Sequence, residues 1–207
     1  MGNHIGCSNL STLVAQFVHE EWNPHSVDHP PEKYPPVVAR GYSYPSAVAT
    51  FYAPSEQCGI RGLHRQHIHA SPSWRNSKVA RFDCVFVQKD SDLPGIHGLY
   101  VAQVLLFFSF THQSIEYPCA LVRWFDLVGD HPCPKTGMWM VEPEFDDQGE
   151  RLVSVISVKS ILRLAHLIPV YGDTLVPRDF SHTDSLFAFA AYYINKFADY
   201  HVYKLLS

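Results

Sequence analysis

The sequence predicts a mainly β protein in which a small β-barrel is flanked by helices. Short apolar segments alternate with turn-rich segments between Arg81 and Tyr171; they are DCVFVQ, LYVAQVLLFFSF, CALVRWF, GMWMV, LVSVIS and LAHLIPV. Alternating and continuous apolar runs at this spacing indicate the strands of a curved sheet or barrel. The 15 prolines and the 14% aromatic content also fit strands and turns better than a helical bundle.

Length and charge narrow the class of protein further. A chain of 207 residues with 46% hydrophobic residues is expected to form one compact domain with appendages. The charged fraction of 17% is low, because typical globular domains contain about 25%. The formal net charge of −4 gives no overall attraction to nucleic acid or anionic lipid. Any such contact must therefore come from a local patch.

Neither a membrane segment nor a secretion signal is expected. No apolar run approaches the roughly 18 residues of a membrane helix, and the N-terminus lacks the basic and apolar regions of a signal peptide. The five cysteines are scattered and form no CxxC motif. This pattern favours reduced thiols in an intracellular protein.

Two elements are expected before the strands. Residues 1–22 contain an amphipathic helix, whose apolar stripe consists of Leu10, Leu13, Val14, Phe17 and Val18. Residues 23–48 contain six prolines, at positions 24, 30, 31, 35, 36 and 45. Because each proline fixes its own φ and restricts the preceding residue, this segment is predicted to be an extended linker.

The rest of the chain divides into three parts. Residues 49–80 form a basic, histidine-rich segment with few strand signals, and residues 79–173 form the predicted barrel. A C-terminal helix is predicted over 184–206, with Asp184 as its N-cap. Its apolar positions recur at helical spacing: Leu186, Phe189, Tyr193, Phe197 and Tyr200.

The basic segment is the first candidate binding site. No acidic residue occurs between Glu56 and Asp83. Cationic side chains neutralise phosphates, and an aromatic ring can stack on a base. The candidate nucleic-acid-binding residues are Arg61, Arg65, Trp74, Arg75, Lys78 and Arg81. An ordinary solvated surface is the alternative interpretation.

The same segment contains a pattern of metal-ligating residue types. Cys58, His64, His67 and His69 follow the spacing C-x5-H-x2-H-x-H. Imidazole and thiolate groups bind zinc, but this spacing matches no standard zinc finger. Histidines in a solvated loop are the favoured interpretation, so no metal or cofactor is expected. A metal-dependent enzyme that uses these residues stays open as an alternative.

Aromatic residues of the predicted strands between Arg81 and Tyr171 are a second candidate site. Tyr100, Trp124 and Trp139 could form an exposed pocket for a cationic group, although core packing is the commoner role of such residues. The acidic cluster around Pro143 and Gly149 has the composition of a hairpin loop. No nucleophile, phosphate-loop or metalloprotease motif occurs, so catalysis is not expected.

Five stretches of the chain, in order, carry a family resemblance. They cover 49–74, 98–112, 117–145, 151–173 and 191–205, and include GLYVAQVLLFFSFTH and YPCALVRWFDLVGDHPCPKTGMWMVEPEF. These stretches resemble the region after the catalytic core in fungal transposase-like proteins of the Kyakuja–Dileera–Zisupton superfamily, Plavaka group. The RNase H-like core of that family has no counterpart here, so the resemblance implies an accessory module and not transposition chemistry.

A second resemblance concerns the strands of the barrel. VRWF (122–125), TGMWMVEPEF (136–145), VSVISVKSI (153–161) and AHLIPVYG (165–172) are similar to elements of bromo-adjacent homology (BAH) domains, which are SH3-like barrels associated with chromatin. The two resemblances together imply a non-catalytic binding module derived from a transposable element. Its expected partners are DNA, chromatin proteins or another transposase domain or chain, in the nucleus. A relic domain that has retained no ligand is the alternative.

Overall fold

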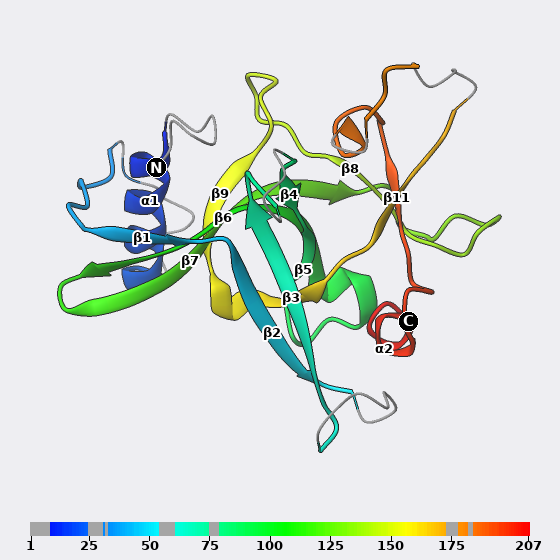
Figure 1. Cartoon of the computed structure of the whole chain (residues 1–207), viewed down its shortest axis with the longest axis horizontal. Helices are drawn as coiled ribbons and strands as arrows, with labels where there is room; N and C mark the ends of the chain where they lie inside the picture. Colours follow the sequence, from blue (N-terminus) through cyan, green and yellow to red (C-terminus); the bar gives the residue numbers. More distant parts are fainter. Residues whose placement is uncertain are drawn as a thin grey trace.

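The main element of the fold is a nine-stranded antiparallel sheet built around one long hairpin (Figure 1). The computed structural model describes residues 9–24, 31, 33–53, 61–74, 79–172, 178–181 and 184–207. The hairpin consists of β6 (Leu99–His112) and β7 (Ile115–Leu127). Every residue of β6 from 101 to 110 is buried. Both faces of this strand are covered, which explains its continuous apolar run.

The sheet is curled, and the strands at its two ends, β10 and β11, follow each other in the chain. Its strand order is β10-β5-β6-β7-β8-β12-β11. The strands besides the hairpin are β5 (Cys84–Gln88), β8 (Met140–Pro143), β10 (Ile161–Leu164), β11 (Leu167–Pro169) and β12 (Tyr192–Ile194). Only Ala165 and His166 separate β10 from β11, so one bent segment joins both ends of the curl. The mainly β, barrel-like fold predicted from the sequence is confirmed.

Two further strands extend the edges of the central hairpin. β1 (Gly41–Tyr44) pairs with the C-terminal half of β6, and β9 (Val153–Ser157) pairs with β7. Short 3-10 turns, η2 (Gly95–Gly98) and η3 (Val158–Ser160), precede β6 and β10. The inside of the curl is filled by large buried side chains, among them Phe86, Val101, Phe125, Val141 and Tyr192.

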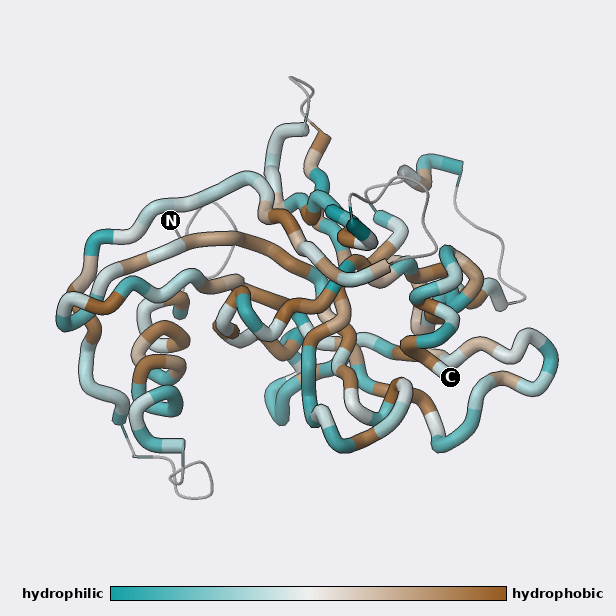
Figure 2. The backbone as a smooth tube through the Cα atoms, turned by 90° about the horizontal axis from the view of Figure 1, so that it is seen from below, coloured by the Kyte–Doolittle hydropathy of each residue, from teal (hydrophilic) through white to brown (hydrophobic). Residues whose placement is uncertain are grey.

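The N-terminal helix is present as α1 (Leu10–Trp22) and covers one end of the long hairpin. Its buried residues Phe17 and Val18 pack in one cluster with Phe108, Leu121 and Val155 of the sheet. Figure 2 shows apolar residues recurring along α1 and along the central strands. The predicted apolar stripe of this segment therefore packs on the domain.

The linker predicted for 23–48 and the strand-poor segment predicted for 49–80 are partly wrong. β1 lies within the first, and β2 (Ser46–Tyr52), β3 (Leu63–Ser71) and β4 (Arg81–Phe82) form a three-stranded sheet. Exposure alternates along β2 and the first part of β3, but polarity does not follow it, because Val48 and Leu63 are exposed whereas His64 and Gln66 are half-buried. Pro45 stands between β1 and β2, where no ladder hydrogen bond needs its missing N–H.

The C-terminal helix predicted for 184–206 is also wrong in its extent. The structure has β12 in the middle of this segment and a short helix, α2 (Tyr200–Leu205), at its end. Tyr192 and Ile194 are fully buried, and β12 pairs with both β8 and β11. This tertiary pairing overrides the helical spacing of the apolar residues. Asp199, and not Asp184, caps the helix that forms.

Candidate functional site

The candidate nucleic-acid interface is the outer face of the two-stranded ribbon formed by β2 and β3. The strands pair in register from Ser46 opposite His69 to Tyr52 opposite Leu63. Alternation along each strand gives the ribbon an exposed outer face, which consists of Val48, Thr50, Tyr52, Leu63, Arg65 and His67. The described ribbon residues, 46–53 and 61–71, include no acidic side chain. This face is therefore basic and partly aromatic.

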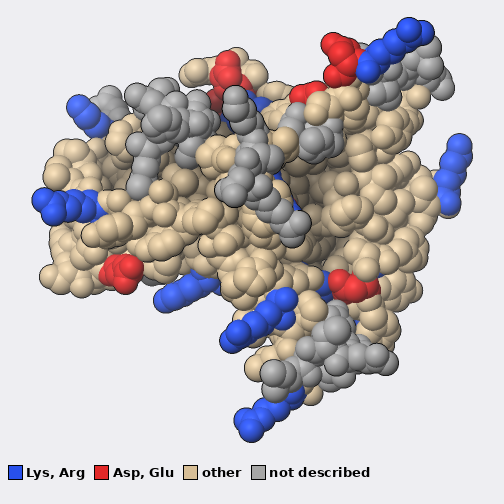
Figure 3. Space-filling model, in the orientation of Figure 1, with Lys and Arg blue, Asp and Glu red and all other residues tan. Residues whose placement is uncertain are grey.

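Tyr52 lies against Gly62 at the end of the described ribbon. Arg61 is exposed and has a positive φ of 56°, and Gly62 follows with a φ of 77°. A Cβ at Gly62 would lie 2.6 Å from the Tyr52 ring, so the ring packs directly on this glycine. On the face shown in Figure 3, Lys and Arg side chains project from the lower part of the molecule, where the ribbon ends in Figure 1.

The inner face of the ribbon anchors it to the barrel. Ile68 is almost fully buried in a cluster with Val85 and Val104. The side-chain oxygen of Gln66 accepts a hydrogen bond from the backbone N–H of Leu164 in β10 (3.2 Å). The ribbon is thus held against the sheet, and its outer face is presented in a defined orientation.

A network at the base of the ribbon includes two of the predicted nucleic-acid-binding residues. Asp83 accepts a hydrogen bond from the backbone N–H of His69 (2.8 Å) and forms an ion pair with Arg81 (2.9 Å). The Arg81 guanidinium also lies 4.8 Å from the ring centroid of Trp74. Half-buried Trp74 and Arg81 therefore support the ribbon, and Asp83 offsets the charge of Arg81.

Of the histidines in the metal hypothesis, the rings of His67 and His69 lie 6.3 Å apart, but His64 does not join them. His64 lies on the inner face, where its ring is 5.3 Å from that of Phe51, whereas His67 lies on the outer face. The ring of His69 contacts Asp83 through Nδ1 (2.9 Å). Among the described residues, no group of three or more His, Cys, Asp or Glu side chains could hold a metal ion. Three residues of the sequence hypotheses lie outside the described residues: Cys58, Arg75 and Lys78.

The predicted aromatic set is only partly brought together. The rings of Tyr100 and Trp124 make an edge contact at 5.5 Å, but Trp139 instead contacts the ring of His97 at 5.3 Å. Both tryptophans are half-buried, and the Lys89 ammonium already lies 5.0 Å from the Tyr100 ring centroid. The cavity beside Tyr100 measures about 70 Å³, which suits a few water molecules better than an organic ligand.

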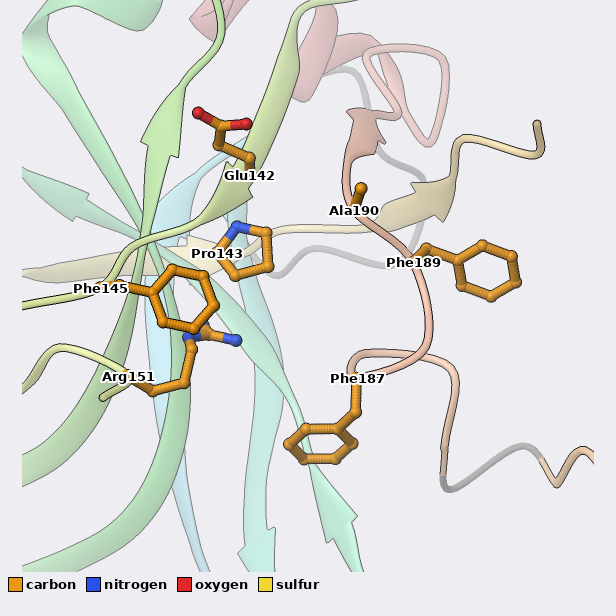
Figure 4. A pocket seen from close by; sticks show the side chains of 7 residues that line it. All are labelled: Glu142, Pro143, Phe145, Arg151, Phe187, Phe189 and Ala190. Carbon is orange, nitrogen blue, oxygen red and sulfur yellow. The ribbon is translucent and has the colours of Figure 1, made fainter. Parts of the chain in front are cut away.

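A larger pocket lies elsewhere on the barrel and was not predicted from the sequence. Its volume is about 600 Å³, and it is lined by Glu142, Pro143, Phe145, Arg151, Phe187, Phe189 and Ala190. Figure 4 shows Phe145 and Arg151 on one side and Phe187 on the other, with the Glu142 carboxylate directed away from them. We call this site the Phe–Arg pocket.

The lining of the Phe–Arg pocket includes two charged residues, Arg151 and Glu142. Burial lowers the pKa of Arg151, and the neighbouring Arg123 lowers it further. Burial also raises the pKa of Glu144, with Asp126 acting in the same direction and Arg151 in the opposite one. Within the described residues, Arg151 forms no ion pair. The pocket therefore holds a cationic group that no carboxylate of the described residues contacts directly.

Two separate stretches of sequence form this pocket. Phe145 and Arg151 flank the acidic hairpin, whose turn is held by Asp146 accepting from the backbone N–H groups of Gln148 and Glu150. Phe187 and Phe189 precede β12. Pairing of β12 with β8 brings the two stretches together. The acidic hairpin was recognised from the sequence as a loop, but nothing in the sequence indicated that Phe187 and Phe189 lie beside it.

No helix in the described part of the chain has the length and apolarity that a bilayer crossing needs.

Comparisons of the chain with protein-family models, with curated proteins and with solved structures find no match.

Proposed function

We propose that this protein is a non-catalytic binding module that contacts nucleic acid through the outer face of the β2–β3 ribbon. The observation that carries the proposal is the acid-free outer face with its exposed Arg65, together with the exposed Arg61 just before β3. Neither arginine forms an ion pair with the described residues. Their charges are thus available to phosphates.

The shape of the ribbon supports the same proposal. A two-stranded β-ribbon fits the major groove of B-DNA, and guanidinium groups along it neutralise phosphates and release counterions. Tyr52, opposite Leu63 at the ribbon end, offers a ring on which an unpaired base can stack. Because the whole chain carries a net charge of −4, binding of this kind depends on the local patch.

The sequence resemblances suggest where such binding takes place. A module similar to the accessory region of transposase-like proteins, with strands similar to a BAH barrel, would dock to DNA or chromatin in the nucleus. The proposal extends to a second transposase domain or chain as a protein partner. The barrel then acts as the scaffold that holds the ribbon.

Salt-dependent binding tests the proposal. The wild-type protein is titrated into short labelled duplex and single-stranded DNA at ~50 mM and ~200 mM salt, followed by fluorescence anisotropy. We expect binding that weakens with salt. The double variant Arg61→Gln/Arg65→Gln should lower the slope of log K against log salt by about 2, since each phosphate contact contributes about 0.9.

A matched variant controls for the loss of net charge. Lys135→Gln/Arg178→Gln also removes two exposed cations, both outside the ribbon, and should leave the slope unchanged. Equal effects of the two double variants would contradict the ribbon as the interface. Absence of DNA binding by the wild-type protein at low salt would contradict the proposal itself and favour a relic domain without a nucleic-acid ligand.

A further inference from the structure

The Phe–Arg pocket has the dimensions and lining of a small-ligand site. Its volume of about 600 Å³ lies within the range of about 300–1,000 Å³ that is typical of ligand pockets. Phenylalanine rings and Pro143 supply apolar walls, and Arg151 supplies one convergent charged group (Figure 4). Such sites commonly combine apolar walls with a few polar groups that orient the ligand.

The protein does not satisfy all the hydrogen-bond donors of the Arg151 guanidinium. Its Nη2 donates to the backbone oxygen of Trp124 (2.9 Å), whereas its buried Nε has no hydrogen-bond partner in the described part of the structure. A guanidinium has five N–H donors in a fixed fork and cannot accept hydrogen bonds. Because this Nε is buried, an anionic ligand in the pocket would be bound through the terminal nitrogens of the guanidinium.

Two guanidinium groups are stacked on the rings of this pocket. The central carbon of Arg151 lies 5.6 Å from the ring centroid of Phe145, and that of Arg123 lies 5.4 Å from the ring centroid of Phe187. These contacts hold the arginines over the aromatic walls. They also place a second positive charge close to the first, whereas the Glu142 carboxylate of the lining is directed away from both rings (Figure 4). This arrangement favours an anionic group at Arg151.

We infer that the Phe–Arg pocket binds a planar ring that carries a carboxylate or a phosphate. The ring lies between Phe145 and Phe187, and the anionic group is bound by Arg151. Phe145 and Phe187 are 56% and 58% exposed, so a ligand ring would bury apolar surface that the free protein leaves in water. This site is independent of the proposed nucleic-acid interface, because no ribbon residue lines it.

Matched acidic and neutral probes test the inference. Indole-3-acetate and its neutral amide test the carboxylate, and adenosine 5′-monophosphate and adenosine test the phosphate. Isothermal titration calorimetry with the full chain should show that at least one acid binds about tenfold more tightly than its neutral counterpart. The acid that shows this preference identifies the anionic group. Equal affinity within both pairs, or no binding of any probe, would overturn the inference.

Variants assign the binding to the named residues. Arg151→Gln should reduce the acid-to-neutral affinity ratio to near one, whereas Phe187→Ala should weaken an acid and its neutral counterpart by a similar factor. Phe197→Ala is the control, because Phe197 is similarly exposed (63%, against 58% for Phe187) but lies outside the pocket. Since Phe187 is exposed, its replacement tests the pocket even if Arg151→Gln fails to fold. Binding that survives Phe187→Ala unchanged would also overturn the inference.

The pocket and the nucleic-acid interface can be tested separately. Phe187→Ala should leave DNA binding by the ribbon unchanged, and Arg61→Gln/Arg65→Gln should leave binding of the acidic probe unchanged. Loss of both activities in one of these variants would show that the sites are not independent.

Discussion

Arg163, the most deeply buried side chain in the ion pairs of the described residues, pairs with Asp199. Arg163 is only 4% exposed, and its Nη2 donates to a carboxylate oxygen of Asp199. The other oxygen of Asp199 accepts from the backbone N–H groups of His201 and Val202 and so caps α2. A single carboxylate thus joins β10 to the C-terminal helix.

Replacement of this carboxylate should be strongly destabilising. Asp199→Ala leaves a buried guanidinium without its partner and removes the helix cap, so we expect a loss of about 3 kcal/mol in the free energy of unfolding. Urea denaturation measures this loss. Asp179→Ala, at an exposed position, is the control. A loss below about 1 kcal/mol would show that Arg163 is stabilised mainly by its contact with the Phe51 ring.

The same carboxylate should make stability depend on pH. Burial alone would raise the pKa of Asp199, but the Val202 N–H and the Arg163 guanidinium lower it more, so the net shift is downward. The contribution is therefore complete above the unfolded pKa of about 4 and is lost as pH falls toward the folded value. Urea denaturation from neutral to acidic pH should show the wild type and Asp199→Asn converging below about pH 4. A gap that stays constant over this range would contradict the assignment.

Cys133 should be the most reactive cysteine of the described residues. Hydrogen bonds, first from the Thr136 side chain and then from the Thr136 and Lys135 backbone, lower the pKa of its thiol to about 7. Burial raises the pKa of Cys84 and of Cys119 to about 12. Because the thiolate is the reactive form, brief alkylation near neutral pH should modify Cys133 before Cys84 and Cys119. Peptide mass spectrometry measures the order.

The hydrogen bond from Thr136 provides the matching variant. Thr136→Val should slow alkylation of Cys133 near neutral pH and shift its midpoint toward about 8.5, the value of an ordinary thiol. Alkylation of Cys133 and Cys119 at equal rates in the native protein would be inconsistent with the difference in their surroundings.

Single residues of the candidate sites were predictable to different degrees. Arg61 and Arg65 stood out from the sequence because acidic residues are missing around them. The pairing of Arg81 with Asp83 could not be read from the sequence, because it depends on the bend between β4 and β5. Arg151 was not singled out, since its role arises from Phe187, which follows it by more than 30 residues.

At the scale of elements, the long hairpin depends on a tight turn with unfavourable residues. Gln113 and Ser114 both have positive φ, 49° and 65°. Two consecutive residues of this kind form a hairpin turn that favours Asn-Gly, because other residues pay a steric cost there. Gln113→Asn/Ser114→Gly should therefore raise the free energy of unfolding by about 1 kcal/mol.

Chemical denaturation checks this prediction. Gln148→Asn, in the turn of the acidic hairpin, is the control, because its φ is not positive and the substitution should change stability by less than about 0.5 kcal/mol. A stability decrease in the double variant would mean that Gln113 or Ser114 makes a contact that outweighs the backbone strain.

The elements divide into those with a clear sequence signal and those without one. The buried strands β5, β6 and β7 have continuous apolar runs and were predicted, as was α1 with its apolar stripe. The ribbon was missed because apolar residues such as Val48 and Leu63 face solvent while His64 and Gln66 lie on the half-buried face, so no apolar-polar alternation appears in the sequence. The segment around β12 was assigned to a helix because Phe189, Tyr193 and Phe197 match a helical period, although pairing with β8 and β11 decides its conformation.

At the scale of the whole molecule, the β6–β7 hairpin contributes residues to two apolar clusters, one on each of its faces. Phe108 and Leu121 pack with α1 on one face, whereas Val104 and Val122 pack beneath the ribbon on the other. β6 is also paired on both edges, to β7 along one and to β5 and β1 along the other. The centre of the fold is therefore protected from water by neighbours in every direction.

The ribbon is attached to this centre more weakly. Near its tip, Tyr52 and Leu63 pair only with each other, and both are exposed. Local opening is easiest where few apolar contacts cover the backbone hydrogen bonds. A ribbon that opens without unfolding of the barrel would be able to adapt its outer face to a ligand.

Hydrogen exchange should resolve these two levels of stability. We expect the amides of Val101–Phe110 to exchange only through global unfolding, and those of Thr50–Tyr52 and Leu63–Arg65 to exchange through local opening at a much lower free energy.

Phe17→Ala should lower the free energy of unfolding by about 3 kcal/mol, because Phe17 is buried between α1 and the sheet. This variant should accelerate exchange in β6 by that amount while exchange at the ribbon tip stays the same. Equal acceleration at both places would show that the ribbon and the barrel unfold as one cooperative unit.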